Sequence, residues 1–403
     1  MPLGWIDFSK SERNKVLSVL DLLSESGTLD ELGIAPIRDG FADLFFPGTS
    51  TIQTRAKYFF IVPYALRDLE RSHEDNPNRA LQYLDDIERE CALTFIQNNR
   101  DENGVIGKVT LQQGRWVKRT PASIYWAGLR QYGIFTGGNL SLTEYVRAMC
   151  ALKMQKETAL KLGNRHDNSE NRDTDDRNAG EHFRMRFWQI PTYTSDWKKD
   201  LDIALTDKEA SYLHERIIHA FPDSMMAYIL RERMTDALAA DSFQSLHSLI
   251  SLFPTEIQDD YHLALSFSDF LFVIRSVYNM IVSEGENEAA NQVWQKSRPY
   301  LSDIAAVPLG DVFSRLAIVG NYPLRSFLER SQSCMRSADL DGLKKEITNR
   351  EIALKGTNRA KTMHPEQFDP QGWYGGRELD YRFRNAKVIL TDIFGGEGVY
   401  AES

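Results

Sequence analysis

Apolar residues recur every three or four positions along most of this chain, which predicts helices joined by short polar turns. The clearest helix starts are capping boxes, in which Ser or Thr precedes Glu by three residues. They lie at Ser9 and Glu12, at Ser141 and Glu144, and at Thr206 and Glu209. The first part of the chain is expected to hold helices at about 10–24, 51–72, 77–97, 121–132 and 142–162, and further helices are expected from 206 to about 354.

Two details refine this helical pattern. Thr120 followed by Pro121 predicts a capped start with proline at the first helical position, and Thr49 or Ser50 is expected to cap the helix at 51–72. Between Tyr58 and Leu66 that helix is apolar on nearly every side, so it should be a central buried element. Before it, residues 33–46 are expected to form a loop anchored by buried apolar side chains: Phe41, Leu44, Phe45 and Phe46.

Two segments interrupt the helical period. Residues 104–118 contain three glycines and short alternating runs, which predicts a small β-hairpin. Residues 163–183 are almost wholly polar and predict a flexible loop between domains. The expected fold is therefore mainly α, with two helical domains at 1–162 and 184–403 and the hairpin in the N-terminal one. A single strand is expected within 184–191.

Composition narrows the class of protein. The 403 residues are 42% hydrophobic and 26% charged, with a formal net charge of −9, which excludes a uniformly basic binder of the histone type. Any contact with nucleic acid must be local. The N-terminus lacks a signal-peptide pattern and no membrane span is expected, while three widely spaced cysteines (Cys91, Cys150 and Cys334) are typical of buried thiols. These features predict a cytoplasmic protein.

Basic and aromatic residues are concentrated in two blocks, at 44–70 and 115–134. In the second block, Arg115, Lys118 and Arg119 precede a predicted helix N-terminus, where unpaired N–H groups favour a phosphate. Their mixture with Trp116, Tyr125 and Trp126 has the composition of a nucleic-acid groove. Packing in a core is the commoner use of helical rings, so that alternative stays open.

For Arg55 and Lys57 of the first block, the same two interpretations are open: an internal structural role or contact with nucleic acid. Arg55 adjoins the apolar helix and needs a carboxylate or phosphate partner if it is buried, with Asp43 or Asp68 as possible acceptors. A third group, Lys355, Arg359 and Lys361, surrounds a glycine turn and is followed by further arginines. Acidic residues intermix with this group, so internal salt bridges compete with phosphate contacts there.

Patterns for catalysis are weak. Arg177 and His182 fit the Arg-x4-His spacing of helical HEPN ribonucleases, which act on RNA by acid–base chemistry and charge stabilisation. The match lies in the polar loop, where chance matches are common. We assign no catalytic residue, no metal ligand and no cofactor, because metal-ligand spacing, a dinucleotide fingerprint and a nucleophile elbow are all missing from the sequence.

Three strings carry a resemblance over nearly the whole chain: FFPGTSTIQTRAKYFFIVPY, RTPASIYWAGLRQYGI and LDYRFRNAKVILTDI. The chain resembles a family of bacterial proteins similar to accessory components encoded beside helicases, methylases or nucleases in phage-defence and restriction-like islands. The resemblance implies a context and partners of those classes. No catalytic residues are established for the family, so it implies none here.

The sequence thus predicts a non-catalytic adaptor or nucleic-acid-contacting subunit of a bacterial defence complex. DNA or RNA would contact local basic patches drawn from Arg55, Lys57, Arg115, Lys118, Arg119, Lys355, Arg359 and Lys361. Two alternatives remain, a metal-independent ribonuclease built on Arg177 and His182, and a pure protein-interaction scaffold.

Overall fold

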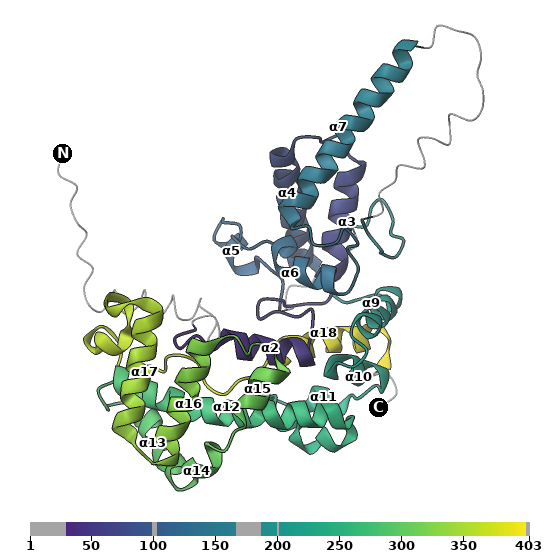
Figure 1. Cartoon of the computed structure of the whole chain (residues 1–403). Coiled ribbons are helices and arrows are strands. Elements are labelled where there is room, and N and C mark those ends of the chain that lie inside the picture. Colours follow the sequence, from purple (N-terminus) through teal and green to yellow (C-terminus); the bar gives the residue numbers. More distant parts are fainter. Residues whose placement is uncertain (1–29, 99–102, 167–186, 200, 400–403) are drawn as a thin grey trace, which may run out of the picture. The chain divides into compact units, whose positions relative to one another are not determined.

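The computed structural model describes residues 30–98, 103–166, 187–199 and 201–399. These residues form helices and turns, as the sequence predicted, and divide into two compact units (Figure 1). The first unit contains the described residues up to Phe45 together with Ser242–Tyr381. The second unit contains Phe46–Asp241 and the segment that begins at Arg382. Each unit is therefore built from two stretches that are distant in the sequence.

The chain passes between units after Phe45, Asp241 and Tyr381. Residues 163–166, the described start of the polar segment predicted to separate two domains, belong to the second unit, and residues 167–186 lie outside the described part of the chain. Low hydrophobicity indicates that a segment stays out of a core, but it does not reveal which apolar faces pack together. The packing of those apolar faces determines which stretches of the chain belong to each unit.

Four helices pack together in the second unit: α3 (Tyr58–Arg71), α4 (Pro77–Asn98), α6 (Pro121–Gln131) and α7 (Leu142–His166) (Figure 1). Every residue of α3 from Tyr58 to Leu66 is buried, which confirms the prediction of a central element. The predicted caps are also confirmed. Thr120 accepts a hydrogen bond from the Ser123 amide, and Ser141 and Glu144 form a reciprocal pair of bonds before α7.

The prediction for the region before α3 was partly wrong. Residues 51–57 form turns, so α3 begins at Tyr58, and the Thr49 hydroxyl donates to the Phe46 carbonyl, 2.6 Å away, instead of capping α3. The expected loop at 33–46 is largely helix α2 (Ala35–Phe45), in the first unit. Asp30 starts this helix, because its carboxylate accepts hydrogen bonds from the Ile34 and Ala35 amides, both 2.6 Å long.

The predicted β-hairpin is not present. The described residues from 103 to 118 form turns and one short helix, α5 (Lys108–Gln112). The alternating apolar runs in residues 104–118 are only two or three residues long, which is too short to form a stable pair of strands. Gly107 starts the helix with φ of 88°, and a Cβ atom there would lie 2.4 Å from the Trp116 ring. The expected strand at 184–191 is reduced, in its described part, to one antiparallel bridge between Phe135 and Trp188.

A second layer of helices completes the second unit: α9 (Asp207–Ala220), α10 (Met225–Arg231), α11 (Asp236–Ala239) and α18 (Phe383–Gly396). The capping box of Thr206 and Glu209 is confirmed at the start of α9. α18 packs against α9, α10 and α11, so the last described helix completes the core begun by the second unit's earlier residues.

The first unit is arranged around α12 (Thr255–Val282) (Figure 1). Around it lie α13 (Glu288–Ser297), α14 (Leu301–Ile304), α15 (Leu309–Arg315), α16 (Tyr322–Arg336) and α17 (Leu340–Lys355). The unit also contains short 3-10 turns: η1 (Gln244–Ser248) and η2 (Ile250–Leu252) before α12, η3 (Arg298–Tyr300) between α13 and α14, and η4 (Thr357–Arg359), η5 (Lys361–Met363) and η6 (Pro365–Gln367) after α17.

α12 is the one helix in the described part of the chain that is long and apolar enough to cross a membrane. Its most apolar window is 67% buried inside the structure, as in the central helix of a globular core. Other helices of the first unit pack against α12 and account for its burial.

Residues 370–381, which we call the strap, run along α12 without regular secondary structure. Polar side chains of α12 bind the strap backbone: the Asn279 amide group pairs with both the N–H and the carbonyl of Tyr374, and Ser268 accepts from the Leu379 amide. The Tyr381 hydroxyl in turn donates to the Ala264 carbonyl. The polar positions of this apolar helix therefore hold a neighbouring segment that lacks its own backbone pairing.

Four helices end in the same way, with a residue other than glycine in the left-handed region: Arg233, Glu284, Ala317 and Ala338. After α16, the Ala338 and Asp339 amides donate back to the Met335 and Cys334 carbonyls, which is the Schellman pattern. Glycine is usual at the left-handed position because a Cβ atom is strained there. The φ of 52° at Ala338 therefore stores strain.

Replacing Ala338 with Gly should raise the free energy of unfolding by up to about 1 kcal/mol, because relief of strain exceeds the added chain entropy. Urea denaturation of the purified protein measures this change. The matched control is Ala289→Gly on the exposed face of α13, which should instead lower the free energy by about 1 kcal/mol. A loss of stability at position 338 would contradict the proposed strain.

Candidate functional site

The basic residues of the first block are used inside the second unit. Arg55 forms an ion pair with Asp392 of α18, with 2.9 Å between Nη2 and Oδ1, and the Asp392 carboxylate also accepts from the Ala56 amide at 2.7 Å. The interpretation of Arg55 as part of an internal ion pair is confirmed. The partner is neither Asp43 nor Asp68, because the sequence could not show that α18 packs beside residue 55.

Lys57 is more deeply buried. Its ammonium lies 2.7 Å from the carboxylate of Glu209, and both side chains are only 8% exposed. The same carboxylate accepts from the Thr206 amide to close the cap of α9. One acidic side chain therefore satisfies a buried cation and a helix start, and Lys57 is not presented to solvent.

The rings of the second block are packed. Tyr125 is fully buried, and its hydroxyl accepts hydrogen bonds from the Thr54 and Arg55 amides, 2.9 and 3.0 Å long. The Trp126 ring packs against Phe135, with 4.6 Å between ring centroids. The core interpretation of these two residues is confirmed, and neither ring is available to stack on a base.

The N-terminus of α6 already holds a carboxyl group of the protein itself. Buried Glu88 of α4 accepts a hydrogen bond from the Ala122 amide at 2.5 Å. Burial raises the pKa of the Glu88 carboxyl to about 8, although the Ala122 amide opposes that rise. The predicted phosphate position at the start of this helix is therefore occupied by Glu88.

Three basic side chains remain on the surface of this region. Arg115, Lys118 and Arg119 are exposed in the segment between α5 and α6, which we call the basic loop (residues 113–120). Arg115 donates to the neutral side chain of Gln113, and Lys118 and Arg119 form no hydrogen bond or ion pair within the described residues. Their charge is therefore not neutralised by a carboxylate of the described chain.

The third basic group belongs to the first unit and is largely paired. Lys355 forms ion pairs with Glu31 and with Glu351, and Lys361 lies 2.9 Å from Glu31. Both carboxylates are buried, and Glu351 also accepts hydrogen bonds from Tyr278 and Thr362. The prediction of internal salt bridges is confirmed for the two lysines, with Glu31 and Glu351 as the partners.

Arg359 is exposed and donates to the Lys355 carbonyl. It belongs to the first unit, whereas the basic loop belongs to the second. Arg177 and His182 lie outside the described residues. Within the described part of the chain, no three His, Cys, Asp or Glu side chains are grouped as they would be to hold a metal ion.

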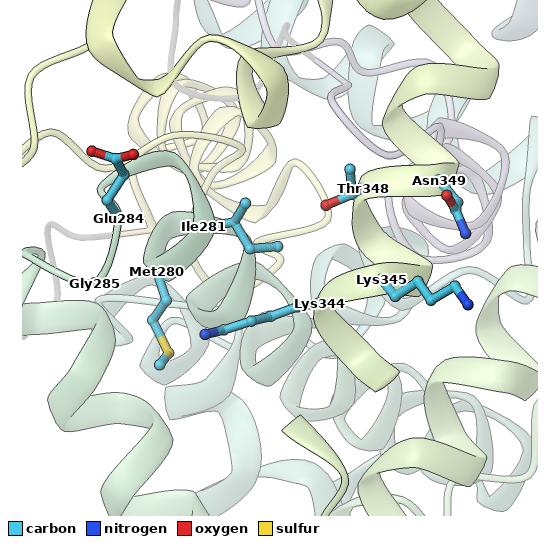
Figure 2. A pocket seen from close by; sticks show the side chains of 8 residues that line it. All are labelled: Met280, Ile281, Glu284, Gly285, Lys344, Lys345, Thr348 and Asn349. Atoms are coloured by element: carbon cyan, nitrogen blue, oxygen red, sulfur yellow. The ribbon is translucent and has the colours of Figure 1, made fainter. Parts of the chain in front are cut away.

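The sequence patterns did not point to a groove in the first unit, between the end of α12 and α17 (Figure 2). It has a volume of about 420 Å³, and its walls include Met280, Ile281, Glu284, Lys344 and Thr348. In the sequence, the adjacent lysines 344 and 345 were the feature that could have indicated a binding site here. Paired lysines on a helix are usually solvated, so the signal was not distinctive.

Comparisons with known proteins add a family match to this geometry. Residues 1–161 match the profile of a family of unknown function (DUF6361), which covers less than half of the chain. No curated protein and no solved structure matches the chain. The match therefore carries no activity, and the argument for function rests on the residues themselves.

Replacing Asp392 with Asn should lower the free energy of unfolding by about 3–5 kcal/mol, because the mostly buried Arg55 guanidinium loses its counter-charge. Urea denaturation measures the loss. Asp223→Asn, at an exposed position of the same unit, is the matched control and should change stability by less than about 0.5 kcal/mol. Equal effects of the two changes would show that the Arg55 pair is not needed.

The raised pKa of Glu88 predicts a particular pH dependence. The folded protein holds this proton more tightly than the unfolded chain, whose carboxyl has the ordinary pKa of 4.5. Neutral Glu88 therefore makes its full contribution to the free energy of unfolding below the pKa of the unfolded chain. This contribution is lost as the pH rises towards the pKa of about 8 in the folded protein. Between these values the wild-type protein should lose about 1.4 kcal/mol per pH unit relative to Glu88→Gln.

Denaturation of both proteins in a pH series from about 5 to about 8 isolates this contribution, since other titrating groups are common to both. The stability difference should move steadily in favour of Glu88→Gln as the pH rises. Parallel curves would show that Glu88 is charged in the folded protein at neutral pH.

Proposed function

We propose that this protein is a non-catalytic subunit that contacts a nucleic-acid backbone through the basic loop. The observation that carries the proposal is the exposure of Arg115, Lys118 and Arg119 without a carboxylate partner among the described residues. Phosphate oxygens are the natural partners of such a group. The other predicted residues contribute less, because Arg55, Lys57, Lys355 and Lys361 are paired internally.

The loop is held between fixed elements. The Arg115 amide donates to the Thr110 carbonyl at one side, and Thr120 caps α6 at the other. This anchoring fixes the backbone at both ends of the three basic residues, which reduces the entropy lost when phosphate binds. Three cations on a protein with a net charge of −9 give only a modest local attraction. Such a contact suits a subunit whose main affinity comes from its partner proteins.

The wider context in the proposal is an accessory role in a cytoplasmic bacterial defence complex, beside a helicase, nuclease or methylase. This part rests on the resemblance carried by the three sequence strings. The alternative of a pure protein-interaction scaffold is favoured by one observation, the internal pairing of four of the eight predicted basic residues. The ribonuclease alternative stays a prediction, which Arg177→Ala and His182→Ala variants would test in a cleavage assay.

Reversing the charge of the basic loop, with Arg115, Lys118 and Arg119 all replaced by Glu, should abolish salt-sensitive binding. Fluorescence anisotropy with labelled single-stranded DNA, duplex DNA and RNA across a salt series measures it. For the wild-type protein on duplex DNA, the log–log salt slope should be no steeper than about −3, since each phosphate contact contributes about −0.9.

The matched control reverses three other exposed basic residues, Lys199, Lys296 and Arg298, and changes the net charge by the same amount. It should retain most of the binding. If both triple variants weaken binding equally, only net charge matters and the basic loop is not the site. If the wild-type protein binds none of the probes at low salt, the scaffold alternative replaces the proposal.

A further inference from the structure

The groove beside α12 is a second place where charged side chains remain unpaired. Its walls come from the last turn of α12, from the turn that follows, and from the middle of α17 (Figure 2). All of these elements belong to the first unit, so the groove is independent of the basic loop. Its volume of about 420 Å³ is in the range of small-molecule sites.

Opposite charges line this opening. Lys344 extends from α17 towards the side of the groove that Met280 and Ile281 form, whereas Lys345 extends the opposite way (Figure 2). Glu284 stands on the turn after α12. Neither the Lys344 side chain nor the Glu284 side chain forms a hydrogen bond or ion pair with another described residue. A cation and an anion thus line one groove without meeting each other.

The backbone fixes the position of Glu284. Its amide donates to the Ile281 carbonyl and the Gly285 amide donates to the Met280 carbonyl, so Glu284 occupies the left-handed position of a Schellman turn with φ of 52°. The turn closes the C-terminal end of α12, where the helix dipole is negative. This end of the groove therefore favours a cation, and the carboxylate adds to that preference.

The remaining walls are apolar or neutral. Met280 is 9% exposed and Ile281 is half-buried, which gives an apolar surface between the two charges. Thr348, one helical turn after Lys344, contributes a hydroxyl group to the lining. A multiply charged phosphate is disfavoured, because Glu284 and the end of α12 would repel it.

We infer that the groove binds a small zwitterion of the α-amino acid or short-peptide class. Its carboxylate would pair with the Lys344 ammonium, its ammonium with the Glu284 carboxylate, and an aliphatic side chain would cover Met280 and Ile281. The match of two unpaired, opposite charges across an apolar surface carries this inference. Free amino acids and short peptides share this chemistry, and the length of the ligand distinguishes them.

Isothermal titration calorimetry of the full-length protein tests the inference with three probes: L-leucine, leucyl-leucine and N-acetyl-L-leucine. L-leucine or leucyl-leucine should bind at millimolar or lower concentration, and the tighter of the two shows whether the site takes a free amino acid or a peptide. N-acetyl-L-leucine, which lacks the ammonium group, should bind at least tenfold more weakly than L-leucine if the free amino acid is the ligand.

Two single variants identify the groove as the binding site. Lys344→Gln and Glu284→Gln should each weaken binding at least tenfold, while the matched control Lys296→Gln, at an exposed position of the same unit outside the groove, should bind as the wild-type protein does. Urea denaturation of the three variants establishes that each is folded. Absence of binding by both L-leucine and leucyl-leucine, or binding that neither variant at 344 or 284 weakens, would overturn the inference. Neither result bears on the basic loop.

Discussion

The second unit depends on one constraint, that a cationic side chain removed from water must meet a carboxylate. Arg55 and Lys57 stand immediately before α3, whose residues from Tyr58 to Leu66 are all buried, and are largely buried with it. An unpaired charge at either position would cost several kcal/mol. The two carboxylates come from Glu209 on α9 and from Asp392 on α18, far along the chain. These two ion pairs specify that α9 and α18 lie beside the start of α3. Apolar packing alone would allow other helices to lie there.

The first unit meets the same constraint at a different place. Glu31 and Glu351 are buried near Lys355 and Lys361, so that residues before α2, the end of α17 and the start of η5 are joined by charge. The strap adds a neutral version of this arrangement, because Asn279 and Ser268 of α12 satisfy backbone groups that have no helix or sheet of their own. In both units, polar groups in an apolar setting define the register of segments that are remote in sequence. Charged side chains that have no partner within the described protein are then the groups available to bind other molecules.

Local rules predicted the helices well where a start signal was present. Thr120, Ser141 and Thr206 cap helices as their sequence contexts indicate, because capping depends on residues only three positions apart. The hairpin prediction was wrong, since brief alternation beside glycines is compatible with turns and a short helix. Partners of buried charges could not be predicted, because Asp392 and Glu31 are distant in sequence from the cations they meet. The groove at Lys344 was also missed, since it forms only when α17 packs beside the end of α12.

The passage of the chain between units has a consequence for synthesis on the ribosome. The core of the second unit is begun by residues 46–241 and completed by α18, which is synthesised after all the residues of the first unit. Until then Arg55 lacks Asp392, and the apolar faces of α9 and α10 lack their cover. The first unit likewise waits for its closing residue, Tyr381. The second unit therefore cannot be completed before the first has been synthesised, and its partly built core stays exposed during that interval.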